Sequence, residues 1–251
     1  MYNDEEFTQL EQEERTLTDE AIAVLILLLS GIHSALEKEL RSFYQKYGTD
    51  GVVTYLQSRK WVSNSDHRKR INALNSFMVN RFNEVVPELE DAFETMVKGV
   101  IAKECGFFDI DLDDNLSLEW GEDADDWLGR LVDDIELWKM RLQRDWKRAL
   151  VQKKHIDEVL KDLEERFDSI YSVITTLALT ESTAVGSLAR KEIFKQLGVN
   201  KYRYYAKVDE RTCEVCGSMH GLTFPMSAYE VGVTASPMHP RCRCWEVPIW
   251  D

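Results

Sequence analysis

The sequence has few of the residues that interrupt regular structure and no excess of basic charge. It contains 5 prolines and 12 glycines in 251 residues, which argues against a low-complexity chain. A formal net charge of −14 argues against a protein whose main task is to neutralise nucleic-acid phosphates, although local, non-specific DNA contact stays open. The 44% of apolar residues suffices for one or two packed domains.

The sequence also lacks an obvious leader or membrane span. The most apolar run, residues 21–32, covers about twelve residues, whereas a bilayer requires roughly 20. The first 20 residues hold eight acids and one arginine, unlike the basic start of a secretory signal. We therefore expect no membrane contact and a cytosolic site of synthesis, where thiols and metal sites outnumber disulfides.

Hydrophobic spacing predicts a long helical body. Apolar residues recur at helical intervals from Leu25 to Tyr47, after a capping Thr18 and before a stop at Gly48. A second stripe runs from Ile71 to Val100. It contains Pro87, where we expect a kink or a break into two helices.

The middle of the chain is less decided. Residues 105–121 indicate an acidic loop with a short extended piece. Residues 122–178 allow one helix of nearly fifty residues or a hairpin that turns between Val151 and His155, and the pattern does not choose. We expect a further helix to begin at Thr180-Glu181-Ser182 and to stop at Gly198.

After this helix the hydrophobic period changes from 3.6 to 2. Residues 202–208 alternate as a strand, and residues 223–224 and 245–247 are candidate short strands. The predicted fold class is mainly α with a small α+β C-terminal domain: a helical body (1–178) followed by a short-stranded, zinc-knuckle-like Cys/His tail (179–251).

Four of the five cysteines lie in this tail, within 32 residues that also contain a histidine. A C-x2-C turn followed by glycine brings two thiolates towards one ion, and an imidazole and two further thiols follow about twenty residues later. This pattern predicts a structural zinc site with four protein ligands. The alternatives are disulfides or unligated thiols. The candidate ligands are Cys213, Cys216, His239, Cys242 and Cys244.

Five candidates compete for four places. We favour Cys213, Cys216, His239 and Cys242, while Cys244 is able to replace His239 or Cys242. The fifth cysteine, Cys105, is predicted to be a packing residue.

Other polar residues admit a structural and a functional interpretation. Asp209, Arg211 and Thr212 are expected to fix the turn before the first thiol pair through hydrogen bonds, and His220 to be a turn residue. The alternative is a metal-dependent nuclease or toxin-like site built from His220, His239 and Asp209. Basic clusters at residues 59–70 and 139–154 are expected to be solvated or paired with acids rather than to bind DNA.

The tail motifs resemble those of the phage Mu F-like, or phage head-morphogenesis, family over roughly residues 165–247. One departure is Tyr204-Tyr205, where the family often has tryptophan. The matching motifs are Thr180-Glu181, the D-x-R-T-C-x-x-C run of residues 209–216, Gly221-x-x-Phe224, and the closing H-P-x-C-R-C of residues 239–244.

This resemblance implies a function that composition and spacing do not show. It implies a non-catalytic minor head protein that enters the procapsid in few copies, associates with portal and capsid proteins, and supports head assembly and genome delivery. The implied location is the virion head, and the host cytoplasm during assembly.

Overall fold

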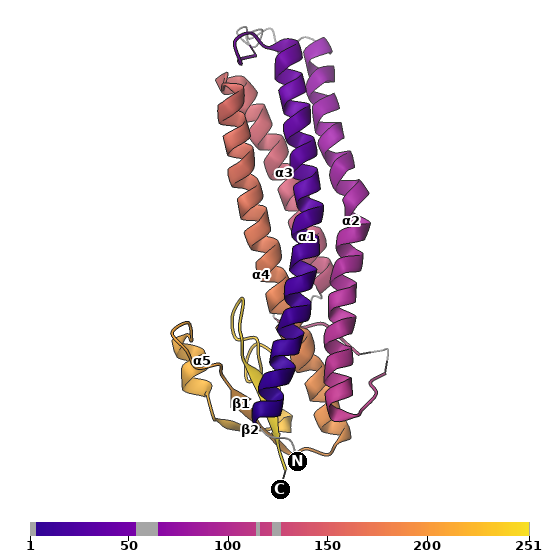
Figure 1. Cartoon of the computed structure of the whole chain (residues 1–251), viewed down its shortest axis with the longest axis vertical. Helices are drawn as coiled ribbons and strands as arrows, with labels where there is room; N and C mark the ends of the chain where they lie inside the picture. The colour runs from indigo at the N-terminus through magenta and orange to yellow at the C-terminus, as the bar shows by residue number, and fades with distance from the viewer. Residues whose placement is uncertain (1–3, 54–64, 114–115, 122–126, 251) are drawn as a thin grey trace. The chain divides into compact units, whose positions relative to one another are not determined.

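The structure, a computed structural model, describes residues 4–53, 65–113, 116–121 and 127–250. In this part of the chain long helices precede a three-stranded antiparallel sheet of order β2-β1-β3, which confirms the predicted fold class (Figure 1). The elements are α1 (Asp4–Tyr47), α2 (Ser65–Phe108), α3 (Trp127–Gln152), α4 (Ile156–Gln196), β1 (Lys201–Tyr205), α5 (Glu214–Met219), β2 (Thr223–Pro225), the 3-10 turn η2 (Met226–Ala228) and β3 (Trp245–Ile249).

The chain divides into two compact units. Unit 1 comprises residues 1–23, 91–130 and 175–251, and unit 2 comprises residues 24–90 and 131–174. Each of α1, α2 and α4 contributes residues to both units, so the units are not consecutive stretches of sequence. The predicted domain boundary between residues 178 and 179 stays a prediction.

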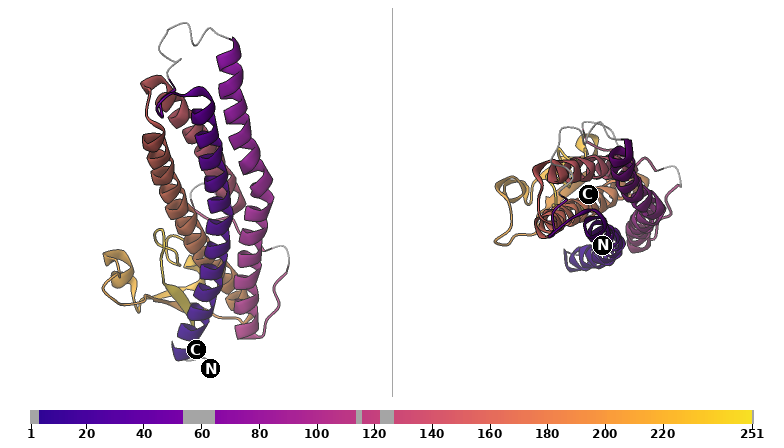
Figure 2. Two further views of the ribbon diagram at one scale, coloured as in Figure 1. Left: turned by 45° about the horizontal axis from the view of Figure 1, so that its top comes forward. Right: turned by 90° about the horizontal axis from the view of Figure 1, so that it is seen from above.

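Unit 2 is a bundle in which segments of α1, α2, α3 and α4 run side by side (Figures 1 and 2). Its core follows the predicted helical stripes, as the spacing of an amphipathic helix requires. The fully buried side chains include Leu25, Leu29, Ile32, Leu36, Met78, Phe82 and Leu131.

The first helix begins earlier than predicted, at Asp4 rather than after Thr18. Positions 7, 10, 14 and 18 continue the helical face, and Phe7 and Leu10 are buried there. Glu14 and Thr18 occupy the same face, so two polar residues concealed the pattern in the sequence. The hydroxyl of Thr18 donates to the carbonyl of Glu14 (2.8 Å) within the helix instead of capping its start.

This helix also shows that the length argument against a membrane span was too strict. It contains an 18-residue window with mean hydropathy 1.7, which is long and apolar enough to cross a bilayer by length and composition. In unit 2 one face of the same stretch is buried, including Leu25 and Leu29, whereas Leu27 is 70% exposed. The absence of membrane contact therefore stays a prediction.

The second helix runs through Pro87 without the predicted break. Pro87 lies on the exposed face, where water can satisfy the carbonyl that the missing N–H leaves unpaired. Phe82 and Leu89, on either side, are buried and hold both halves in the bundle. The same helix extends to Phe108, so residues 105–108 belong to it and not to the predicted loop.

The open choice at residues 122–178 is resolved as a hairpin. The helix α3 ends at Gln152, and α4 starts at Ile156 after a turn in which Lys153 has φ 57°. The predicted new helix at Thr180 is wrong, because α4 continues to Gln196. Thr180 donates to the carbonyl of Thr176 (2.6 Å) within this helix. Gly198, with φ 68°, ends the helical segment as predicted.

Unit 1 contains the sheet. The central strand β1 pairs antiparallel with both β2 and β3, in the three places where strands were predicted. Alternation along β1 buries Tyr202 and Tyr204 completely. Tyr202 packs in an aromatic cluster with Phe194 and Trp245, whereas Tyr204 lies among the tail cysteines.

Candidate metal centre

The first thiol pair is placed by the short helix α5. Cys213 is its N-cap residue, and its sulfur accepts a hydrogen bond from the backbone N–H of Cys216 (3.3 Å). This geometry turns both side chains to the same side, as the C-x2-C spacing predicts. The helix is followed by Gly221, whose φ of 81° reverses the chain into β2.

The structure sorts the five candidate ligands into two groups that share Cys216. One group is Cys213, Cys216 and His239, and the other is Cys216, Cys242 and Cys244; within each group the ligand atoms lie within 4.8 Å of one another. Cys105 belongs to neither group, and its packing role stays a prediction. Among the described residues, the cysteines and the histidine of these two groups are those named from the sequence.

The separations around Cys216 match those expected on one zinc ion. Its sulfur lies 3.8 Å from the sulfur of Cys242 and 3.3 Å from Nε2 of His239. Tetrahedral zinc bonds of about 2.3 Å to sulfur and 2.0 Å to nitrogen place two sulfurs about 3.8 Å apart, and a sulfur and a nitrogen about 3.5 Å apart. These two separations fit one zinc ion, while the four favoured ligands are divided between the two groups that share Cys216.

His239 is oriented for coordination through Nε2. Its Nδ1 lies 2.8 Å from the carbonyl oxygen of Pro240, and because a carbonyl only accepts, Nδ1 carries the proton. Nε2, which faces Cys216, then offers its lone pair. A histidine whose other nitrogen donates to a carbonyl is a common arrangement at protein metal sites.

Local hydrogen bonds favour the thiolate form at two positions. The backbone N–H of Cys216 holds the pKa of Cys213 below its usual value. The side chain of Cys244 donates towards Cys242 and lowers the pKa of that thiol to about 5, despite its burial. Burial raises the pKa of Cys216 to about 12 in the absence of an ion. A bound cation would favour its thiolate, because a coordinating thiol is deprotonated.

All five cysteines are free, so the disulfide alternative finds no support in the geometry. The separation of 3.8 Å between the sulfurs of Cys216 and Cys242 is far longer than the roughly 2.05 Å of a disulfide.

A polar stripe on α4 positions the second ligand loop. Thr180, Thr183, Ser187 and Arg190 recur at helical spacing on one face of this helix. The backbone N–H of Arg241 donates to Oγ1 of Thr180 (3.1 Å), and Oγ1 of Thr183 donates to the carbonyl of Cys242 (3.1 Å).

These bonds support strained backbone next to the ligands. Arg241 has φ 61°, a left-handed conformation that costs a non-glycine residue about 1 kcal/mol or more. Because Arg241 lies between His239 and Cys242, this conformation helps direct both side chains inward.

Ser187 and Arg190, the C-terminal members of this stripe, form hydrogen bonds with Glu246 of β3. Glu246 is fully buried, and its Oε2 accepts from Ser187 (2.8 Å), Tyr229 (3.1 Å) and Arg190 (3.2 Å). Its Oε1 accepts from the backbone N–H of Ser236 (2.6 Å). Glu246 therefore has hydrogen-bond donors for both of its buried oxygens.

Arg190 also faces two carboxylates from the other helices of unit 1. Its Nη2 lies 2.5 Å from Glu104 and 3.2 Å from Glu14, and all of these side chains are buried. One guanidinium cannot neutralise three carboxylates, so burial raises the pKa of Glu14 well above its ordinary value and also raises that of Glu104.

The residues of the alternative nuclease site have structural partners. Asp209 pairs with both terminal nitrogens of Arg243 (2.6 Å each) and accepts from the backbone of Arg211 (2.9 Å). The Arg243 pair and the backbone bond hold the pKa of Asp209 well below its usual range. Nδ1 of His220 accepts from the backbone N–H of Ala206 (3.1 Å). Asp209 and His220 thus have structural partners, but the charged partner of Asp209 is Arg243, and Arg211 contributes its backbone N–H.

The glutamate of the Thr180-Glu181 motif has a separate role. Glu181 is buried and accepts from the indole N–H of Trp120 (2.9 Å) and from Arg130 (3.0 Å). Arg130 in turn donates to the carbonyl of Trp120 (2.7 Å). The motif therefore ties the acidic loop after α2 to α4.

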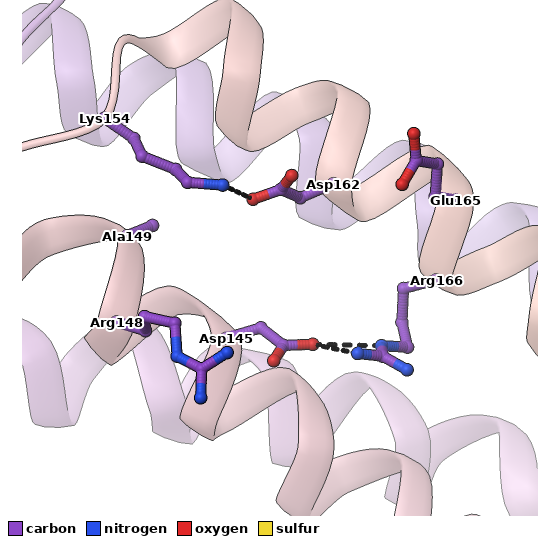
Figure 3. Close-up of a pocket in the computed structure, with 7 residues that line it drawn as sticks. All are labelled: Asp145, Arg148, Ala149, Lys154, Asp162, Glu165 and Arg166. Carbon is purple, nitrogen blue, oxygen red and sulfur yellow. Dashed lines mark hydrogen bonds and ion pairs between the residues drawn. The ribbon is translucent and has the colours of Figure 1, made fainter. Parts of the chain in front are cut away.

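Basic residues of α3 and the α3–α4 turn are partly neutralised by acids. They line a cavity of about 350 Å³ in unit 2, where Arg166 pairs with Asp145 and Lys154 pairs with Asp162 (Figure 3). Lys139 is buried beside Glu136. Lys139, Arg144 and Lys154 of the 139–154 cluster are thus paired with acids, whereas residues 59–64 of the other basic cluster lie outside the described residues. DNA contact stays a prediction.

Sequence reasoning missed the groups that surround the ligands. The polar stripe on α4 was a usable signal, because polar residues at helical spacing inside an apolar helix usually face a partner. The ion pairs of Glu14 and Glu104 with Arg190 had no such signal in the sequence, because other acidic residues lie near each of them and nothing marks these two as buried.

Residues 140–247 match the family model described as Phage Mu protein F like protein. The match includes every candidate ligand and begins within α3, upstream of the segment in which we saw the resemblance. No curated protein and no solved structure matches the chain.

The matched segment contains α4, β1, β2 and the Cys/His centre, and its similarity is to phage head-morphogenesis proteins. Over residues 140–247 the chain is similar to the phage Mu F-like family.

Proposed function

We propose that the protein is a non-catalytic minor component of the phage head that associates with the portal and procapsid and supports head assembly and genome delivery. The observation that carries this proposal is the family match over residues 140–247. Its location would be the virion head, after synthesis and assembly in the host cytoplasm. Its partners would be portal and capsid proteins.

Mass spectrometry of purified particles tests this proposal. Full and DNA-empty heads from an induced source strain would be analysed separately. We expect a few copies of the chain per head, and its retention or loss on emptying would show whether it leaves with the DNA. Its absence from particles that otherwise assemble would contradict the proposal.

We further propose that the tail holds one structural zinc ion through Cys213, Cys216, His239 and Cys242. The proposal is supported by the distances from the Cys216 sulfur to the Cys242 sulfur and to His239 Nε2, and by the orientation of that nitrogen. Four protein ligands would leave no open position for a substrate. When bound, zinc would cross-link the α5 turn to the loop before β3. The protein's own residues fix the ligand backbones and the histidine tautomer.

Metal analysis of protein purified without chelator tests the zinc proposal. We expect about one zinc per chain and thiols that react slowly until the metal is removed. Fewer than about 0.2 zinc per chain, with all thiols quantitatively reactive, would contradict it. The nuclease alternative requires turnover with some divalent metal and its loss in His220→Ala. No activity with any metal would remove this alternative.

A further inference from the structure

Tyr204 lies beside the metal ligands but is not itself one of them. The side chain is 0% exposed, and β1 directs it into a cluster with Cys216, Cys242 and Cys244. Its hydroxyl lies 3.5 Å from the sulfur of Cys216 and 3.9 Å from that of Cys242. These distances suit hydrogen bonds to sulfur, which are longer than those to oxygen.

The backbone of Tyr204 is held from both sides. Its N–H donates to the carbonyl of Leu222 (2.9 Å), and its carbonyl accepts from Gly221 (2.9 Å). On the other edge of β1 the same residue pairs with Glu246 of β3. The hydroxyl is therefore fixed by the sheet and does not have to be ordered when a ligand binds.

The Tyr204 hydroxyl is surrounded by sulfur atoms and apolar side chains. A buried hydroxyl without a hydrogen bond is unfavourable, and in the described part of the chain the Tyr204 hydroxyl has the sulfurs of Cys216 and Cys242 as hydrogen-bond partners. Apolar side chains, including Met219, Phe224 and Met238, pack against the same cluster. In such a setting a hydrogen bond to a charged acceptor is stronger than it would be in water.

Charge balance explains why a donor is needed. Three thiolates and one neutral imidazole around a divalent cation leave one excess negative charge in a buried site. The backbone N–H of Cys216 offsets part of this charge at Cys213, because it donates to that sulfur (3.3 Å). The Tyr204 hydroxyl is placed to offset part of the charge at Cys216 and Cys242 in the same way, by donating a hydrogen bond to sulfur.

We propose that Tyr204 is a positioning residue of the metal centre, whose hydroxyl donates to the Cys216 or Cys242 thiolate and strengthens metal binding. This inference rests on the proposed metal site. It assigns to an aromatic strand residue a role that neither the cysteine spacing nor the family match gives.

The chain provides a matched control in Tyr202. It lies two residues away on the same strand, is equally buried, and donates to the carbonyl of Thr234 (3.3 Å) instead of to sulfur. Tyr204→Phe and Tyr202→Phe in the full-length protein therefore remove one buried hydroxyl each, and only the first faces the thiols. Both variants and the wild type would be titrated with Co²⁺ and then with Zn²⁺.

We expect Tyr204→Phe to weaken Zn²⁺ binding about 10-fold or more, as loss of an outer hydrogen bond to a metal ligand commonly does. The sulfur-to-cobalt charge-transfer band should move to longer wavelength, because a thiolate that loses a hydrogen bond releases charge more easily. Tyr202→Phe should leave the band in place. If Tyr204→Phe matches Tyr202→Phe in both affinity and spectrum, the proposal is wrong while the metal site stands.

A measurement on the wild-type protein covers the case in which Tyr204→Phe does not fold. In protein loaded with ¹¹³Cd, the Tyr204 hydroxyl proton should exchange slowly and show scalar coupling to the metal through the sulfur. Bound cadmium without this coupling would overturn the role of Tyr204. Failure of the wild type to bind Co²⁺, Zn²⁺ or Cd²⁺ would overturn both the metal site and this inference.

Discussion

At the scale of single residues, Cys242 and Cys244 are two positions apart and both lie beside Cys216. Cys242 is the more deeply buried, and its carbonyl is held by Thr183 on α4. The Cys244 side chain is a hydrogen-bond donor to Cys242, and this contact raises the pKa of Cys244 above its usual value. The raised pKa of Cys216 shows that a high pKa in the absence of an ion does not by itself exclude a ligand. Our choice of Cys242 over Cys244 therefore rests on the favoured ligand set, which leaves Cys244 as the fifth candidate.

We therefore predict different outcomes for two serine variants. Cys242→Ser should abolish stoichiometric zinc binding, whereas Cys244→Ser should retain one zinc per chain with affinity reduced by no more than about 10-fold. Metal analysis and competition with a chromogenic chelator would measure both. Equal loss in the two variants would show that Cys244 is a ligand.

The buried Arg190 cluster gives a prediction for pH. Because burial raises the pKa of Glu14, this residue stabilises the fold most below its unfolded pKa of about 4.5, and that contribution is lost as pH rises through the folded pKa. Glu14→Gln should thus gain stability relative to the wild type as the pH rises from 5 to 8.

Thermal unfolding at several pH values would test this effect, with Glu13→Gln as the control. Glu13 is the adjacent acid, but it is half-exposed and pairs with Lys103, whose hydrogen bond lowers its pKa. Its substitution should bring no such gain as the pH rises. A stability difference between Glu14→Gln and the wild type that stays the same from pH 5 to pH 8 would contradict the raised pKa of Glu14.

At the scale of elements, α4 and β3 are joined by the polar stripe rather than by apolar contact alone. Ser187→Ala removes a donor from the buried Glu246 carboxylate, which should cost about 1–3 kcal/mol. Amides of β1 and β3 should then exchange about 5- to 100-fold faster, as measured by hydrogen–deuterium exchange. Ser30→Ala is the control, because that hydroxyl donates only within its own helix, to Leu27 (2.8 Å). Equal exchange in the two variants would contradict the role of the stripe.

The elements also show how far the sequence could lead. Helices with apolar stripes, the three strands and all five candidate ligands were predictable, because each is encoded by local spacing. The start of α1 and the continuity of α4 were not, because Glu14, Thr18 and Thr180 are polar residues in helix interiors. Their partners, among them Arg190, Ser182 and Arg241, are distant in the chain and become visible only in the folded protein.

At the scale of the whole molecule, metal removal should affect the two units differently. The proposed ligands all belong to unit 1, while unit 2 contains none of them. Chelation should therefore abolish protection of the β1 and β3 amides and leave the α3 amides of residues 131–150 protected. Hydrogen–deuterium exchange before and after chelation would measure this. Simultaneous loss in both units would show that they unfold together.

Unit 1 is built from segments at both ends of the chain, and this has a consequence for folding during synthesis. Glu14 and Arg190 are 176 residues apart, and Glu246 is translated later still, so the N-terminal segment of α1 leaves the ribosome long before its buried partners exist. Unit 2, by contrast, has its full set of helices once residue 174 has been made. We expect the unit 2 bundle to form first in the nascent chain. Until the C-terminal segment has been made, Phe7 and Leu10 should stay exposed to solvent or bound to a chaperone.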